Sequence, residues 1–195
     1  MKKVYIIIYF ITFVLQLQAQ TGNISKVSTM YSGKDSWKEW YVNINGTNGT
    51  MKTVYSGDDG WTYWNINLPD YNGTIRTVFA GNDAWNYWRF EFDDCYGYIK
   101  TVYSGEGSWK EWEITDNYGY TIFKVSTVFS GKDAWKSWRV FNYSGNLNVS
   151  TTFSGKEAWN SWTINDFLKD EKIGYKMAAV FACVFSGLKN ATVEK

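Results

Sequence analysis

The stretch Thr127-Val128-Phe129-Ser130-Gly131-Lys132-Asp133-Ala134-Trp135-Lys136-Ser137-Trp138 is the unit from which this chain is built. It occurs six times, and each copy carries a small residue followed by Gly, and then two Trp three residues apart. The copies begin at Thr29, Thr53, Thr77, Thr101, Thr127 and Thr151. Their starting positions lie 24, 24, 24, 26 and 24 residues apart. A period this regular predicts a repeat architecture in which each copy is one supersecondary unit.

Each repeat is predicted to hold two strands. Before the small-Gly pair, one set of alternate positions holds Val125, Thr127 and Phe129 and their equivalents. The positions of the other parity hold polar residues. After the second Trp the alternation resumes, as in Trp40-Tyr41-Val42. Alternation with period two in β-branched and aromatic residues is typical of half-buried strands. The same parity places Phe129 and its equivalents on the core face.

Two conformations are possible for the connection between the two strands of a repeat. In the first, Tyr31 pairs with Trp40, which leaves Asp35-Ser36 as the centre of a two-residue hairpin. In the second, the residues from the Gly to the second Trp form one short helical turn, which puts both Trp on the same side. We favour the hairpin.

The fold class predicted from these patterns is all-β, with six two-strand repeats of about 24 residues plus a closing strand. The closing strand is expected in the half-repeat 177–187, which is apolar on both parities and ends in Phe185-Ser186-Gly187. We expect an antiparallel meander that is curled or closed into a barrel, because closure removes exposed sheet edges. The alternative is a β-solenoid, in which equivalent strands stack in parallel. Residues 21–195 would then form a single all-β repeat domain.

Residues 1–20 have the pattern of a secretory signal peptide. Lys2-Lys3 is followed by an apolar run from Val4 to Leu15, and Ala19 supplies a small residue for cleavage. The Lys-Lys start and Gln-rich end resemble export signals of Gram-negative bacteria of the Bacteroidetes type. The run is too short for a membrane span, which needs roughly 20 residues. We therefore expect a secreted or cell-surface protein, bacterial in origin, without a transmembrane helix in the mature chain.

Composition argues against several classes of function. The chain has no His, which excludes catalysis by Ser-His-Asp or Cys-His and every His metal site. The net charge of +1 gives no reason to expect nucleic acid as a partner. Two Cys, Cys95 and Cys183, allow one bridge at most. The prediction is no enzyme, no cofactor and no metal, with the oligomeric state left open.

Acidic residues recur beside the connection, but one per turn is too few for calcium, which needs several converging oxygen ligands. Turn formation explains them on backbone grounds. They also repeat, whereas a catalytic carboxylate pair should be unique. These turn acids are Asp35, Asp59, Asp83, Asp133 and Glu157, and Gly107 replaces the acid in the fourth repeat.

The candidate ligand-binding residues are the first Trp of each pair, Trp37, Trp61, Trp85, Trp109, Trp135 and Trp159. With a two-residue hairpin they would stand on the polar face, where a Trp ring can stack on the apolar side of a sugar. The sequence therefore predicts a non-catalytic binding module for carbohydrate, with a polysaccharide or glycan as partner. The alternative is a structural or adhesive surface protein in which these Trp only join the repeats. A minor alternative is an outer-membrane β-barrel, whose lipid-facing band the Thr at mid-strand would interrupt.

Overall fold

The computed structural model describes residues 22–81, 83–168 and 170–193, and the predicted signal at residues 1–20 lies outside them. The described residues form twelve strands, six 3-10 turns and one helix. The strands are β1 Ile24–Thr29, β2 Glu39–Ile44, β3 Thr47–Thr53, β4 Tyr63–Leu68, β5 Tyr71–Thr77, β6 Tyr87–Phe92, β7 Cys95–Thr101, β8 Glu111–Asp116, β9 Thr121–Thr127, β10 Ser137–Asn142, β11 Gly145–Thr151 and β12 Ser161–Asp166. The turns are η1 Ser36–Lys38, η2 Asp58–Thr62, η3 Ala84–Asn86, η4 Ser108–Lys110, η5 Ala134–Lys136 and η6 Ala158–Asn160. The helix is α2, Ile173–Val193.

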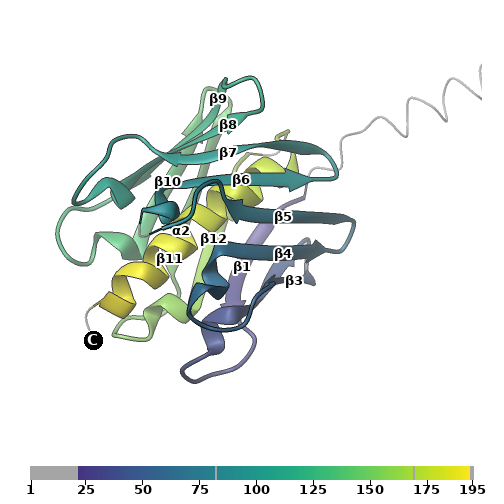
Figure 1. Cartoon of the computed structure of the whole chain (residues 1–195). Coiled ribbons are helices and arrows are strands. Elements are labelled where there is room, and N and C mark those ends of the chain that lie inside the picture. Colours follow the sequence, from purple (N-terminus) through teal and green to yellow (C-terminus); the bar gives the residue numbers. More distant parts are fainter. Residues whose placement is uncertain (1–21, 82, 169, 194–195) are drawn as a thin grey trace, which may run out of the picture.

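The strands form a closed barrel in which every strand pairs antiparallel with its neighbours in the sequence (Figure 1). Closure comes from β1, which pairs with β12, and Val27 lies opposite Trp162 at this seam. The predicted meander closed into a barrel is confirmed. The solenoid is wrong, since Thr29 lies opposite Trp40 in an antiparallel pair and not beside Thr53 in a parallel ladder.

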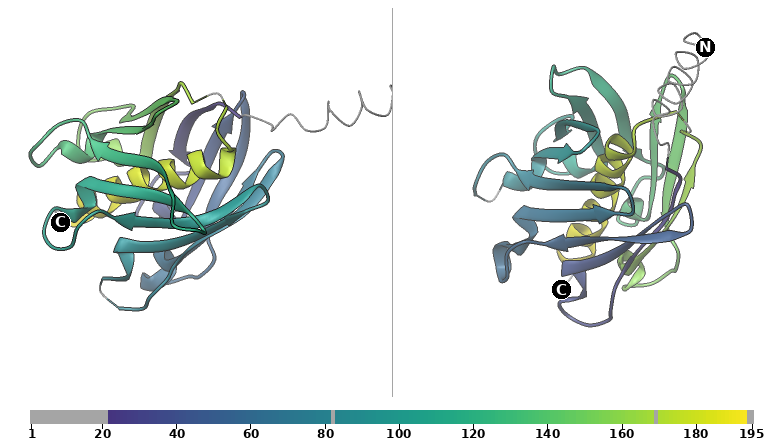
Figure 2. Two further views of the ribbon diagram at one scale, coloured as in Figure 1. Left: turned by 90° about the horizontal axis from the view of Figure 1, so that it is seen from above. Right: turned by 90° about the vertical axis from the view of Figure 1, so that its right-hand side faces the viewer.

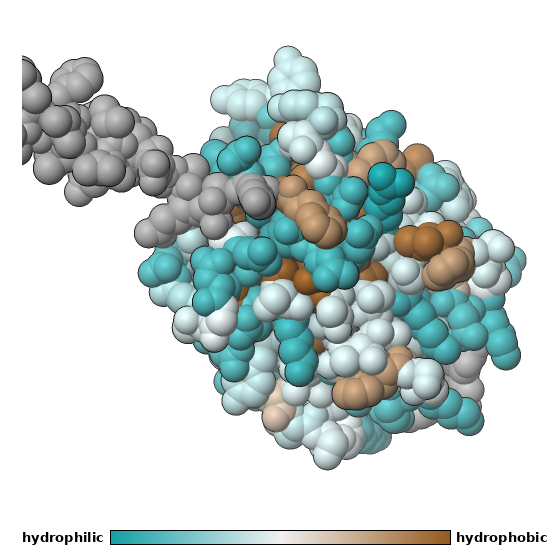
Figure 3. Space-filling model, turned by 180° about the vertical axis from the view of Figure 1, so that it is seen from behind, coloured by the Kyte–Doolittle hydropathy of each residue, from teal (hydrophilic) through white to brown (hydrophobic). Residues whose placement is uncertain are grey.

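The predicted alternation is seen in the strands that follow the second Trp. In β4, Trp64, Ile66 and Leu68 are buried, whereas Asn65 and Asn67 are exposed. The apolar set faces the inside of the barrel, where the core lies, and the polar set forms the outer wall. On the face shown in Figure 3, hydrophilic side chains predominate and hydrophobic ones lie in separate small groups.

The connection inside each repeat is a 3-10 turn, and the two-residue hairpin that we favoured is wrong. Thr29, not Tyr31, lies opposite Trp40, so the pairing stops two residues earlier than expected. In the first repeat the Ser36 amide donates to the Gly33 carbonyl, and Ser36 itself is buried. The equivalent bond recurs in all six repeats. A buried position at this point explains why only Ser, Ala or Gly precedes the first Trp.

The Gly before each turn has a backbone conformation that other residues rarely adopt. Its φ is positive in every repeat, for example +113° at Gly33 and +91° at Gly131. A side chain at positive φ is strained, whereas Gly adopts it freely. The small-Gly pair of the repeat is therefore a requirement of the turn. The six positions are Gly33, Gly57, Gly81, Gly105, Gly131 and Gly155.

The predicted closing strand at 177–187 is wrong, because these residues belong to α2, which runs through the inside of the barrel (Figure 2). Every side chain from Lys176 to Leu188 is buried. A helix surrounded by the sheet is apolar on all sides, so it shows no polar face. A short apolar run of this kind does not distinguish a strand from a buried helix by periodicity.

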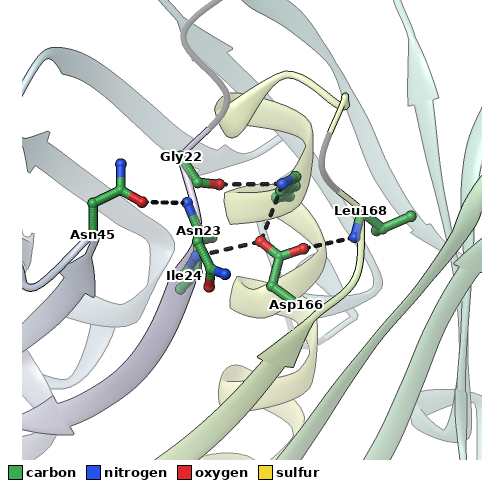
Figure 4. A network of polar contacts seen from close by, with 7 residues as sticks. Gly22, Asn23, Ile24, Asn45, Asp166 and Leu168 are labelled. Carbon is green, nitrogen blue, oxygen red and sulfur yellow. Dashed lines mark hydrogen bonds and ion pairs between the residues drawn. The ribbon is translucent and has the colours of Figure 1, made fainter.

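One buried ion pair fastens the helix to the seam of the barrel (Figure 4). Lys176 Nζ lies 3.0 Å from Asp166 Oδ2 and donates to the Gly22 carbonyl at 3.1 Å. Asp166 also accepts from the amides of Ile24 and Leu168. Both charged side chains are 1% exposed. The pair joins α2 to β12 and to the start of β1.

Candidate functional site

All six 3-10 turns lie at the same end of the barrel, which we call the loop end. This follows from topology, because each turn joins an odd-numbered strand to the next even-numbered strand of an antiparallel meander. The opposite end carries the short turns between repeats, and we call it the hairpin end. The helix enters at the hairpin end, where Lys172 donates to the Asp94 carbonyl, and its Ala191 lies at the loop end.

The turn brings both Trp of a repeat to the same side of the backbone. The first Trp belongs to the turn, and the second Trp, three positions later, is the second residue of the strand that follows it. The indole N–H of Trp162 donates to the Trp159 carbonyl at 2.6 Å. The same bond, at 2.5–2.8 Å, occurs in each repeat. It satisfies the indole of a fully buried Trp.

The first Trp of each repeat packs edge-on against the second Trp of the next repeat. Centroids lie 5.8–6.3 Å apart and interplanar angles are 61–74°, the T-shaped geometry that aromatic pairs favour. Because the contact also crosses the seam, the twelve Trp form one continuous ring. The pairs are Trp37–Trp64, Trp61–Trp88, Trp85–Trp112, Trp109–Trp138, Trp135–Trp162 and Trp159–Trp40.

The predicted site residues are therefore brought together, but not on the polar face where the hairpin would have put them. Trp135 and Trp159 are 4% and 8% exposed. Trp37, Trp61, Trp85 and Trp109 are partly buried and pack against the hydrophobic core. Several also carry a cation on the ring, such as Lys189 Nζ 4.2 Å from the Trp85 centroid.

A second aromatic row at the loop end was not predicted as a site. It is the aromatic residue two positions after the starting Thr, and its members are 42–65% exposed. Sequence parity had placed them on the core face, but the strands end at the starting Thr, so these residues lie beyond the sheet. The signal that could have found them is the Ser-Gly or Ala-Gly pair directly after each one. The row is Tyr31, Tyr55, Phe79, Tyr103, Phe129 and Phe153.

A pocket of about 790 Å³ opens at the loop end beside the seam. Its lining comes from the first, fifth and sixth repeats, which are neighbours around the closed barrel. Trp37, Trp135 and Trp159, together with Ala191 of α2, contribute the apolar part of the lining. Lysine side chains dominate the polar part, and they are Lys34, Lys132, Lys136 and Lys156.

Two of the turn acids form ion pairs with lysines. Asp133 Oδ1 lies 2.7 Å from Lys136 Nζ, and the hydrogen bond with this lysine lowers the pKa of Asp133. Asp35 makes the same contact with Lys38 at 2.8 Å, with the same effect on its pKa. Within residues 22–81, 83–168 and 170–193, no group of three or more Cys, Asp or Glu is placed to hold a metal ion.

The two thiols are separate and buried. Cys95 and Cys183 are both free. Cys95 lies near Gly174, and Cys183 lies nine residues further along α2, which is about 13 Å at the helical rise. A disulfide needs Cα atoms within about 7 Å. Burial raises the pKa of both thiols, which keeps them protonated and unreactive.

In the described part of the chain, no helix has both the length and the apolar character needed to cross a membrane. Comparisons with protein families, with curated proteins and with solved structures find no match to this chain.

Proposed function

We propose that this chain is an exported, non-catalytic binding protein whose ligand is carbohydrate, bound at the loop end of the barrel. The observation that carries the proposal is the exposed aromatic row, which repeats six times around that end. Large aromatic side chains that are exposed in a regular array indicate an interaction surface. Phe129 and Phe153, 65% and 62% exposed, belong to adjacent repeats beside the pocket.

The chemistry of the loop end suits a sugar polymer. An aromatic face can pack against the C–H side of a pyranose ring, while hydroxyl and amine groups bond its hydroxyls. Ser32, Ser36 and Asn160 line the pocket together with its lysines. Six equivalent weak sites on one rigid barrel gain avidity when the ligand is itself repetitive.

The site assignment within this proposal differs from the one predicted from sequence. The first Trp row is buried or partly buried in the ring, and lysines lie over four of its six indoles, so its faces are largely covered. Stacking on the ligand is assigned to the exposed row, and the Trp edges in the pocket are assigned a secondary contact.

The ring of twelve Trp favours a second candidate, a structural or adhesive surface protein without a small-ligand site. In that case the Trp pairs would serve only to hold repeats together, and the exposed aromatic row would contact another macromolecule. An outer-membrane location has less support. Ion pairs on the outer wall, Lys52–Glu39 and Lys100–Glu113, have side chains that are 24–44% exposed and would be costly in lipid.

The test is a glycan-array screen with the folded chain, followed by a double variant, Phe129→Ala with Phe153→Ala. We expect the unmodified chain to bind a polysaccharide. The double variant should bind it with roughly tenfold lower affinity, since one stacked ring contributes about 0.5–1.5 kcal/mol. The matched control is Tyr143→Ala, because Tyr143 is fully exposed at the hairpin end. A folded chain with no hits on the array would favour the structural candidate.

A further inference from the structure

One position of the loop end differs in charge among the six repeats. It is the residue directly after the positive-φ Gly. Lys34, Lys132 and Lys156 occupy it in the first, fifth and sixth repeats. The sequence has Asp58, Asn82 and Glu106 at the same position of the other three. Because the first repeat pairs with the sixth at the seam, the three lysine repeats are contiguous around the barrel. The charge difference therefore divides the loop end into two halves.

The lysine half coincides with the pocket of about 790 Å³, and all three lysines line it. None of the three forms an ion pair with another residue of the described chain, whereas the fourth lysine of the lining, Lys136, is paired with Asp133. Glu157 is the other carboxylate of the lining. Among the described residues that line this pocket, three lysines and one carboxylate thus lie outside any ion pair, which leaves an excess of positive charge.

We infer that the pocket binds the acidic group of an anionic polysaccharide, a carboxylate or a sulfate, between Lys34, Lys132 and Lys156. This inference rests on the proposed function and adds the class of ligand. Lysine is a flexible point charge with three donors, so three of them from three turns can surround one anionic group. Trp37, Trp135 and Trp159 line the same pocket, and an apolar wall beside the lysines strengthens their attraction for an anion.

The net charge of the chain does not account for such binding. It is +1, so any attraction for a polyanion has to come from a local cluster of charge. Neighbouring acidic sugars could reach the aromatic row while one acidic group occupies the pocket. The lysines would then determine selectivity for charged polymers, and the aromatic residues would supply most of the contact area.

The experiment uses probes that differ only in charge. Dextran sulfate is compared with dextran, and polygalacturonate with its methyl ester, by titration calorimetry on the whole mature chain. We expect each charged polymer to bind more tightly than its neutral counterpart, with an affinity that falls as salt rises. Lys34→Gln, Lys132→Gln and Lys156→Gln should each weaken binding about tenfold.

The matched control is Lys26→Gln, which removes the same charge from an exposed position in β1 on the outer wall. Its binding should equal that of the unmodified chain. An equal loss in Lys26→Gln, or equal affinity for charged and neutral polymers, would overturn the inference while the proposed function stands. Absence of binding to all four polymers, charged or neutral, would instead count against both.

One further probe separates an acidic saccharide from other polyanions. A linear polyphosphate with the same number of charges should bind at least tenfold more weakly than dextran sulfate, because it has no ring that can pack on the aromatic row. Equal affinity would make the pocket a general polyanion site and would refute the assignment to saccharide.

Discussion

Trp159 packs edge-on against Trp40 across the seam of the barrel, with ring centroids 6.0 Å apart and an interplanar angle of 66°. Trp159 lies in the turn of the last repeat and Trp40 in β2 of the first repeat. The contact is the same one that joins every other pair of neighbouring repeats. The Trp packing at the seam is therefore the same as between any two neighbouring repeats, since the last repeat meets the first as if it were the next copy.

This packing predicts that Trp159→Ala lowers the free energy of unfolding by about 3–5 kcal/mol, the usual cost of removing a buried Trp from a core. The side chain is 8% exposed and has aromatic contacts that no smaller residue can replace. Urea unfolding followed by far-UV circular dichroism would measure the change. The control is Phe153→Ala in the same repeat, 62% exposed, which should change stability by less than about 0.5 kcal/mol. Equal losses in the two variants would refute the division between a packing row and an exposed row.

A second prediction concerns the buried pair Lys176–Asp166. Lys176→Met removes the cation and leaves the carboxylate buried, so we expect a loss of about 3–5 kcal/mol. Hydrogen exchange at the Ile24 amide should also accelerate. Asp166 accepts a hydrogen bond from this amide, and Lys176 donates one to the carbonyl of nearby Gly22. Lys172→Met is the matched control, because Lys172 is exposed and its amine donates to the Asp94 carbonyl rather than pairing with a buried carboxylate. A stability equal to that of the control would show that the pair does not fasten the seam.

Alkaline pH should destabilise the chain. Burial raises the pKa of Cys95 and of Cys183 above the ordinary 9.0, so the folded state keeps both thiol protons after the unfolded chain has lost them. A raised folded pKa gives stability that is complete below the unfolded pKa and is lost above it. The free energy of unfolding should therefore fall above pH 9, by roughly 1.4 kcal/mol per pH unit for each thiol.

Tyrosine adds to the same trend at higher pH, because burial raises the pKa of Tyr175 to about 12. The measurement is urea unfolding between pH 7 and pH 10.5. Cys183→Ala should retain only part of the slope, whatever its effect on stability at pH 7. A slope that is the same in Cys183→Ala and the unmodified chain would contradict the assignment to the thiols.

The sequence predicted much of the fold because the repeat gives six independent copies of one pattern. In all six copies an apolar residue follows two positions after the second Trp, as Val42 follows Trp40, and this alternation predicted the strand and its facing correctly. The turn was harder, because a two-residue hairpin and a 3-10 turn both fit Asp35-Ser36 between paired strands. The difference between them moved Tyr31 and its equivalents from the core to the surface. The exposed aromatic row was missed for that reason.

The helix could not be predicted from periodicity. Its apolar run, Met177-Ala178-Ala179-Val180-Phe181, has no polar face, because the barrel surrounds it. The pocket also could not be predicted from the sequence, although its lysines are visible there as differences among the repeats. Only closure of the barrel shows that the first repeat adjoins the sixth, and therefore that Lys34 and Lys156 belong to one site.

The last prediction concerns Gly187, the Gly in α2 that ends the apparent half-repeat. Ala is ordinarily more stable than Gly inside a helix by about 1 kcal/mol. Here a Cβ would lie 2.4 Å from Cζ2 and 2.6 Å from Cη2 of Trp162. That ring cannot move aside, since its N–H is bonded to the Trp159 carbonyl and Trp135 packs against it.

Gly187→Ala should therefore reverse the usual sign and destabilise the chain by about 1–3 kcal/mol, the cost of overpacking a core. Trp162→Phe removes the part of the indole that the new methyl would meet, so Gly187→Ala in that background should be close to neutral or stabilising. Urea unfolding of the two single variants and the double variant gives the coupling between the positions. We expect a favourable coupling of at least about 1 kcal/mol, because one substitution creates the clash and the other relieves it. A gain in stability from Gly187→Ala alone would mean that α2 does not pass this close to the Trp ring.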